Sequence, residues 1–127
     1  MAHAPAPDSI YIPSESLRSF MERVFAALGV PAEDARITAD VLLEADLRGI
    51  DSHGIGRLSI YVDRLRSGSQ NPKAPLALVS EAPGTALLDG GSGMGQVIAV
   101  RAMELAIRKA KETGIAGVAA RNSSHFG

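Results

Sequence analysis

Residues 46–61 read DLRGIDSHGIGRLSIY, a stretch in which helix-forming sequence gives way to a turn rich in glycine and ionisable groups. After the turn, three polar side chains, His53, Arg57 and Tyr61, recur at every fourth position. A helix turns by about 100° per residue, so these side chains project from one stripe. The apolar residues of the same segment fall on a separate stripe; they are Ile55, Leu58, Val62 and Leu65. The pattern predicts a helix that packs its apolar stripe on a core and leaves its polar stripe free.

The polar stripe combines an imidazole that titrates near neutral pH, a fixed cation and a phenol. Such a set is typical of a wall that binds a small anionic substrate and exchanges a proton with it. Ser52 stands where it would cap this helix and place His53 in the first turn, where the positive end of the helix dipole lowers the proton affinity of a histidine. A solvated surface helix often carries the same residue types, and the spacing by itself leaves that interpretation open.

The composition of the 127 residues is that of one globular unit, with 46% apolar residues and a net charge of -1. Thirteen Lys and Arg balance fourteen Asp and Glu without a long run of one sign, which argues against a nucleic-acid partner. The absence of cysteine excludes thiolate sites and fits a reducing compartment, so a cytoplasmic location is expected. No apolar run reaches the ~20 residues of a membrane span, and no membrane partner is expected.

Two helices are predicted before the turn. Ser14 is a good N-cap for the first, whose apolar residues keep helical spacing until Gly29; they are Leu17, Phe20, Met21, Val24, Phe25 and Leu28. Pro31 opens a second helix, which ends near Gly49. The Ala/Pro-rich residues 1–13 are expected to be a mobile tail, and residues 14–70 a helical subdomain that carries the Ser-His-Gly turn.

The second half of the chain changes to strand signals. Prolines 72 and 75 favour extended or turn backbone, and the short apolar runs at 76–79 and 85–88 are candidate strands. A glycine cluster at 90–95 leads into a long alanine-rich helix over 96–111, and residues 115–120 form a third candidate strand. The apolar positions of that helix include Ile98, Met103, Ile107 and Ala110. This order predicts an α/β fold in which residues 71–127 begin an α/β domain with a parallel strand-helix-strand unit.

The glycine cluster invites a comparison with phosphate-binding loops, because glycines before a helix can expose backbone N–H groups. The spacing contradicts this interpretation. Counted from Gly91, the last glycine of a G-x-G-x-x-G fingerprint would stand at position 96, where a P-loop would also need its lysine, and position 96 is glutamine. We therefore predict a tight strand-to-helix turn with close backbone packing.

Residues 121–127 read RNSSHFG and place a histidine in a polar loop after a predicted strand. Ligands of open α/β sheets bind at the carboxyl ends of the strands, so His125 is a candidate to share a site with His53. A loop histidine is more often simply exposed. A metal site formed by the two histidines is a further alternative, but it falls short of the usual ligand count.

Several motifs together resemble the malate/L-lactate dehydrogenase family of the second type. They are Arg48-Gly49-Ile50-Asp51-Ser52-His53-Gly54, Arg57, Asp89-Gly90-Gly91 and residues 121–127. The likeness covers most of residues 14–127, with the motifs in the family's order. Relatives in this family act on ureidoglycolate, sulfolactate, diketogulonate and cyclic imino acids.

The resemblance implies hydride transfer between NAD or NADP and a small 2-hydroxy or 2-oxo acid, or an imine analogue, in a fold unlike the ordinary Rossmann dehydrogenases. Carried over by position, it implies that His53 and His125 are the two candidate catalytic residues for proton transfer, and family members differ in which of the two has that role. It also implies that Arg57 binds the substrate carboxylate and that Ser52 and Tyr61 line the substrate pocket.

Family members are considerably longer than this chain and are dimers. The resemblance therefore implies the N-terminal portion of a larger enzyme, inactive by itself, whose cofactor-binding residues mostly follow Gly127. A homodimer is expected, and the remainder of the enzyme is a candidate partner as a separate chain. The alternative from a different class is a non-catalytic binding or interaction domain that keeps the scaffold and performs no chemistry.

Overall fold

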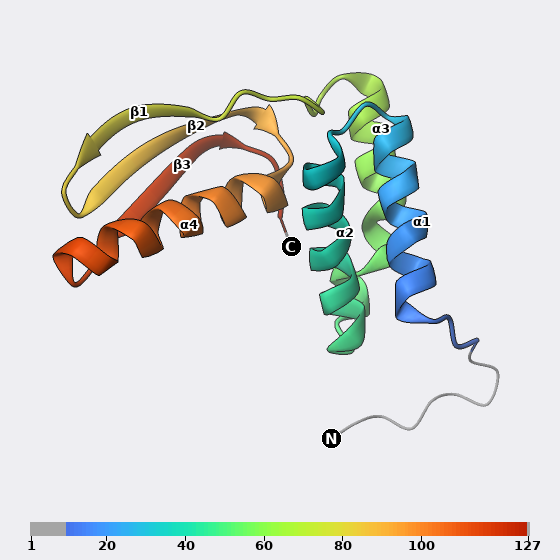
Figure 1. Cartoon of the computed structure of the whole chain (residues 1–127). Helices are drawn as coiled ribbons and strands as arrows, with labels where there is room; N and C mark the ends of the chain where they lie inside the picture. Colours follow the sequence, from blue (N-terminus) through green and yellow to red (C-terminus); the bar gives the residue numbers. More distant parts are fainter. Residues whose placement is uncertain (1–9, 127) are drawn as a thin grey trace.

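The computed structural model describes residues 10–126, so most of the expected tail, residues 1–9, lies outside the described part. Three helices come first in that part, α1 (Ser14–Ala27), α2 (Ala32–Leu47) and α3 (Leu58–Ser67), with the 3-10 turns η1 (Asp51–His53) and η2 (Ile55–Arg57) between α2 and α3. Strands β1 (Ala77–Ala82) and β2 (Thr85–Gly93), helix α4 (Gly95–Thr113) and strand β3 (Gly117–Ser123) follow. Figure 1 shows α1–α3 as a group beside the sheet with α4. The predicted α/β class, a helical part followed by a β-α-β unit, is confirmed.

The sheet has the order β1-β2-β3. Strands β1 and β2 form an antiparallel hairpin, and β2 and β3 are parallel and connected through α4, as the strand-helix-strand order predicts. Helix α4 packs against β2 and β3 along one face of the sheet (Figure 1). This arrangement brings the carboxyl ends of β2 and β3 to the side of the sheet that faces the helices. Within the described part of the chain, every helix is too short or too polar to cross a membrane.

The glycine cluster lies mostly inside a strand and not in a turn. Strand β2 continues to Gly93, with a register shift after Asp89 where Gly91 adopts a φ of +54°. A Cβ atom on Gly90 would lie 2.5 Å from the Cδ1 of Ile98 in α4. The prediction of close backbone packing is therefore correct. The predicted strand-to-helix turn is shortened to Met94, because the earlier glycines form an irregular strand end that packs against α4.

Neither serine that the sequence suggested as an N-cap acts as one. Ser14 is the first residue of α1, after Pro13, and its side chain makes no capping hydrogen bond. Ser52 lies inside η1, and α3 begins only at Leu58. The α-helix cannot begin at Ser52 because Gly54 has a φ of -90° and a ψ of -147°, which interrupts the helical backbone.

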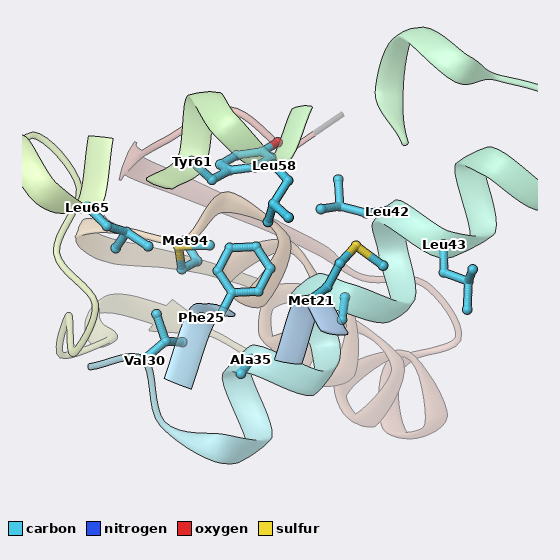
Figure 2. Close-up of a cluster of buried hydrophobic side chains, with 11 residues drawn as sticks. Met21, Phe25, Val30, Ala35, Leu42, Leu43, Leu58, Tyr61, Leu65 and Met94 are labelled. Atoms are coloured by element: carbon cyan, nitrogen blue, oxygen red, sulfur yellow. The ribbon is translucent and has the colours of Figure 1, made fainter. Parts of the chain in front are cut away.

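One hydrophobic core fills the space between the first three helices (Figure 2). Its buried members are Met21, Phe25, Val30, Ala35, Ala39, Leu42, Leu43, Leu58, Tyr61, Leu65 and Met94. The rings of Phe25 and Tyr61 meet edge to face, with centroids 6.5 Å apart. Met94 stands between β2 and α4, so its burial here attaches the sheet to the helices.

The helical spacing located most of this core correctly. Leu58 and Leu65 are buried as predicted, and Ile55 and Val62 pack against the same cluster. Tyr61, which the spacing assigned to the free polar stripe, is only 1% exposed. Its ring occupies core space while its hydroxyl reaches polar partners, a combination that tyrosine allows and periodicity does not reveal.

Three large apolar residues at helical spacing are exposed: Phe20 of α1 is 46% exposed, and Met103 and Ile107 of α4 are 60% and 49% exposed. Among residues 10–126, other side chains cover these three only in part. Periodicity identifies an apolar face, but it does not say whether another part of the chain packs on it.

The two phenylalanines of α1 provide a matched test of the core. Phe25→Ala removes a fully buried ring and is expected to lower the free energy of unfolding by about 3–5 kcal/mol. Phe20→Ala removes the half-exposed ring of the same helix and is expected to cost less than about 1 kcal/mol. Urea denaturation followed by circular dichroism measures both, and equal costs would contradict the packing described here.

Candidate active site

The turn that carries His53 is closed by an aspartate from the end of α2. The Oδ2 atom of Asp46 accepts the backbone N–H of Ile55 at 2.8 Å. A Cβ atom on Gly54 would overlap with the same carboxylate, so any larger residue would expel Asp46 from its place. Asp46 and Gly54 together fix the path of the backbone on both sides of His53.

Within this turn, three predicted site residues form one hydrogen-bonded unit. The Oγ atom of Ser52 lies 2.9 Å from Nδ1 of His53. The Nε–H of Arg57 donates to the backbone carbonyl of Ser52 at 2.7 Å, which folds the arginine back over the turn. The side chains of Ser52, His53 and Arg57 are therefore held next to one another by local contacts.

The loop that carries His125 is held by the hydroxyl of the preceding serine. The Oγ atom of Ser124 accepts the Nε2–H of Gln70 at 2.7 Å and the backbone N–H of Gly95 at 3.0 Å. The same hydroxyl donates to the carbonyl of Gly93 at 2.8 Å. A Cβ atom on Gly95 would collide with the carbonyl groups of Ser124 and His125. The loop thus lies directly on the first turn of α4.

These two segments, far apart in the sequence, bring their histidines together. The rings of His53 and His125 are stacked, with centroids 5.9 Å apart and planes inclined by 24°. The hydroxyl of Tyr61 lies 3.2 Å from Nδ1 of His125. It also accepts the Nε2–H of Gln96 at 2.7 Å. All five predicted site residues therefore lie on or beside one cluster, with Ser52 and Arg57 on its His53 side.

The surroundings of His125 disfavour the protonated form of its ring. Loss of hydration in the loop lowers the pKa of its imidazole below the ordinary histidine value, and the positive charge of Arg57 lowers the pKa further. His53 and Arg64 act in the same direction. At neutral pH the ring is therefore in its neutral form, in which one nitrogen carries no proton. A neutral imidazole can accept a proton, as a general base does.

Sequence reasoning missed several residues that build the cluster: Asp46, Gln70, Gly95, Gln96 and Ser124. In the sequence, Gln96 indicated only that the glycine cluster is not a phosphate-binding loop. Gln70 and Gln96 are 0% and 1% exposed. Buried amides must find hydrogen-bond partners, but their partners are 54 and 35 positions away in the sequence. No local pattern signals such pairs.

The glycine-rich end of β2 does not form a phosphate-binding loop, and the described residues include no group of metal ligands. Added Cβ atoms on the glycines of β2 would meet Ile98, Pro75 or Ala74 and not open space, so their backbone has no room for a phosphate. Within residues 10–126, no three side chains of His, Asp or Glu gather as metal ligands would. The cluster can therefore offer a proton acceptor, a guanidinium and hydroxyl groups to a small molecule.

Residues 12–127 match the sequence model of a family described as malate/L-lactate dehydrogenase. The chain is 52% identical over 118 residues to malate dehydrogenase from Pyrococcus horikoshii, covering 93% of this chain and 33% of that protein. It is 50% identical over 113 residues to L-sulfolactate dehydrogenase from Methanocaldococcus jannaschii, and the match covers 89% of this chain and 33% of that protein. Ureidoglycolate dehydrogenase (NAD(+)) from Escherichia coli O157:H7 is 35% identical over 116 residues, and the match covers 91% of this chain and 33% of that protein.

Solved structures show the same fold. The structure of the Pyrococcus horikoshii malate dehydrogenase superposes with a TM-score of 0.96 and 49% identity over 99% of this chain and 36% of that chain. The structure of a delta1-piperideine-2-carboxylate reductase from Pseudomonas syringae superposes with a TM-score of 0.84 and 30% identity. The match covers 93% of this chain and 36% of that chain. The chain spans about a third of the length of the curated relatives it matches.

The contact between Gly95 and the His125 loop gives a direct test of the cluster. Gly95→Ala places a methyl group against two backbone carbonyls that cannot move independently, and it is expected to displace the loop at a cost of about 1–3 kcal/mol. The nuclear Overhauser contacts between the imidazoles of His53 and His125 should weaken. The matched control is Gly117→Ala, because a Cβ atom there would meet nothing within 4 Å. Unchanged contacts in Gly95→Ala would contradict the packing of the loop on α4.

The pKa of His125 gives a second test. We predict that its imidazole titrates below the ordinary value of about 6.5, because of lost hydration and the charge of Arg57. Arg57→Gln should raise the pKa, whereas Arg66→Gln, which removes an exposed arginine of α3, should leave it unchanged. NMR titration of the ring C–H signals measures both values. A pKa that does not respond to Arg57→Gln would remove the guanidinium from the neighbourhood of the ring.

The lowered pKa of His125 also predicts how the stability of the native protein changes with pH. The unfolded chain binds the His125 proton at a higher pH than the native chain does. As the pH falls through the unfolded-state value, the unfolded state is therefore favoured. The stability of the native protein relative to His125→Gln should decrease in that range, as measured by urea denaturation at several pH values.

Proposed function

The chain belongs to the malate/L-lactate dehydrogenase family, and from this premise we propose that it supplies the acid-base and substrate-binding part of an NAD- or NADP-dependent oxidoreductase. The proposed reaction transfers a hydride between the nicotinamide and a small 2-hydroxy or 2-oxo acid. One observation carries the proposal: the stacked pair of His53 and His125, with Arg57 close enough to lower the pKa of His125.

The chemistry divides between the cofactor and the chain. A bound nicotinamide would accept or donate the hydride, and the protein must handle the proton of the hydroxyl group. The glycine-rich end of β2 has no room for a phosphate, so we expect most cofactor-binding residues in the part of the relatives' length that this chain does not span. The similarity to ureidoglycolate dehydrogenase (NAD(+)) supports a nicotinamide cofactor.

Each cluster residue has a role that its surroundings favour. Neutral His125 would accept the hydroxyl proton during oxidation and return it during reduction, because its lowered pKa favours the neutral ring. His53, stacked on it, would hydrogen-bond to the same oxygen. Arg57 would bind the substrate carboxylate, since guanidinium and carboxylate match in charge and geometry. Ser52 and Tyr61 would orient the two histidines through their hydrogen bonds.

The substrate class follows from the same features. Malate and sulfolactate, which occur in the names of the relatives, are both 2-hydroxy acids with a second anionic group. A second candidate is reduction of a cyclic imine, which is supported by the likeness to delta1-piperideine-2-carboxylate reductase. Both reactions need a carboxylate-binding cation and a proton-transfer residue beside it, so the cluster is compatible with either.

We also propose that the protein works in the cytoplasm as a homodimer. The lack of cysteine is consistent with that compartment. Exposed apolar side chains such as Met103 and Ile107 on α4 provide surface that an assembled protein would cover. Size-exclusion chromatography with light scattering measures the association directly.

The decisive experiment joins this chain to the part of a relative that it does not span. In a chimera, residues 12–127 replace the matching third of the Pyrococcus horikoshii malate dehydrogenase, and oxidation of NADH and NADPH is followed with a panel of 2-oxo acids and cyclic imines. We expect turnover in the chimera. His53→Gln and His125→Gln should each lower it by about 10²-fold or more, as loss of a general acid or base does.

His3→Gln, in a form that keeps the N-terminal residues, is the matched control, because position 3 precedes the family match. It should leave turnover unchanged. A folded chimera without activity toward any acid or imine would reject the enzymatic proposal and favour a binding domain. Retained turnover in both histidine variants would reject their assigned roles.

A further inference from the structure

A second arginine lies on the same face of α3 as the proposed carboxylate-binding residue. Arg57, Tyr61 and Arg64 follow one another at intervals of four and three residues, the spacing of side chains on one helix face. Arg57 stands directly before the first residue of α3 with helical backbone, and the other two lie within the helix. The two arginines therefore stand about one turn before and one turn after Tyr61, whose hydroxyl lies 3.2 Å from Nδ1 of His125.

The end of α3 that carries Arg64 is attached to the loop of His125. The backbone N–H of Gln70 donates to the carbonyl of Arg64 at 3.1 Å, and the side chain of Gln70 donates to the hydroxyl of Ser124 at 2.7 Å. The positive charge of Arg64 also contributes to the lowered pKa of His125, so it acts on the ring across a short distance. Arg64 is thus part of the surroundings of the histidine pair.

Carboxylates neutralise several arginines of this protein, but not these two. Within residues 10–126, five arginines form ion pairs with Asp or Glu; they are Arg18, Arg36, Arg48, Arg101 and Arg121. No ion pair in that part of the chain includes Arg57 or Arg64. The other arginines without an acidic partner are exposed to water, whereas Arg57 and Arg64 are partly buried. Unneutralised charges of one sign in such a place attract a ligand of the opposite sign.

The spacing of the two charges suits a ligand with two anionic groups. Arg64 follows Arg57 by seven positions, which corresponds to a rise of about 10 Å along the helix axis. A carboxylate pairs with one guanidinium through two parallel hydrogen bonds, so a monoanion fully engages only one of the two arginines. An acid with an anionic group at each end can engage both, with its central carbons beside the histidine pair.

We propose that Arg64 is a specificity-determining residue, which binds the second anionic group of a substrate such as malate or sulfolactate while Arg57 binds the carboxylate next to the reacting carbon. The inference rests on the proposed function in placing that first carboxylate at Arg57. It adds the residue that selects acids with two anionic groups over acids with one. Binding of the ligand needs no hydride transfer, so the selection is a property of the chain by itself.

NMR titration of the 127-residue chain with L-malate and with L-lactate tests this directly, because lactate is malate without its second carboxylate. The arginine Nε–H signals and the backbone signals of residues 57–64 are followed at low ionic strength, since salt screens charge pairs. We expect malate to shift the signals of both arginines and to bind about tenfold or more tightly than lactate, as one additional charged hydrogen-bonded pair allows. Equal affinities, or no malate-dependent shift at Arg64, would overturn the proposal without any variant.

Three substitutions separate recognition from net charge. Arg64→Gln should reduce the affinity for malate to about that for lactate and leave lactate binding unchanged, because it removes only the second pair. Arg64→Lys keeps the charge and should retain part of the preference for malate. The matched control is Arg66→Gln, which removes the same charge from an exposed position half a turn around α3 from Arg57. It should leave the ratio of the two affinities unchanged, and an equal effect of Arg66→Gln and Arg64→Gln would contradict a specific role of Arg64.

The chimera gives a second readout that distinguishes this inference from the proposed function. In the chimera, Arg64→Gln should lower kcat/KM for oxaloacetate by about tenfold or more and leave kcat/KM for pyruvate unchanged, because only oxaloacetate carries the second carboxylate. An inactive chimera would reject the proposed reaction, while the preference for malate in the titration would still support the role of Arg64. An active chimera in which Arg64→Gln lowers both values equally would overturn the role of Arg64 alone.

Discussion

The three hydrogen bonds of the Ser124 hydroxyl hold the candidate site together. They attach the His125 loop to Gln70 after α3, to Gly93 at the end of β2 and to Gly95 at the start of α4. The hydroxyl uses its one proton and accepts two, so every bond has a distinct partner. The stacking of the histidines depends on this anchoring, because the loop would otherwise be free to leave the first turn of α4.

The core and the site share side chains, so the fold and the candidate chemistry depend on one another. Tyr61 packs its ring against Phe25 and directs its hydroxyl to His125. Met94 leaves the sheet to enter the helical core, one residue before the glycine on which the His125 loop lies. A change in packing at either residue would shift the position of the second histidine.

The sequence predicts the parts of this arrangement that short-range patterns encode. Helical spacing identified Phe25, Leu58 and Leu65 as core residues, and the strand-helix-strand order gave the parallel pair. Spacing could not show that Phe20 remains half exposed, since that depends on what covers the helix. Ser52 failed as a cap because a carboxylate nine positions before Ile55 shapes the turn instead.

For the site, the resemblance to a family located the two histidines, and their approach in space agrees with the expected meeting of two loops. Their catalytic roles, and those of Ser52, Arg57 and Tyr61, remain predictions. The supporting residues Gln70, Gln96 and Ser124 could not be predicted, because their contacts join positions that only the tertiary structure brings together.

The lowered pKa of His125 has a consequence for ligand binding. An anion held by Arg57 would offset the positive charge that disfavours protonation of the ring, so its arrival would draw a proton from solvent. By reciprocity, weak acids in their ionised form would associate more tightly at mildly acidic pH, and calorimetry in buffers of different ionisation enthalpy would detect this proton uptake.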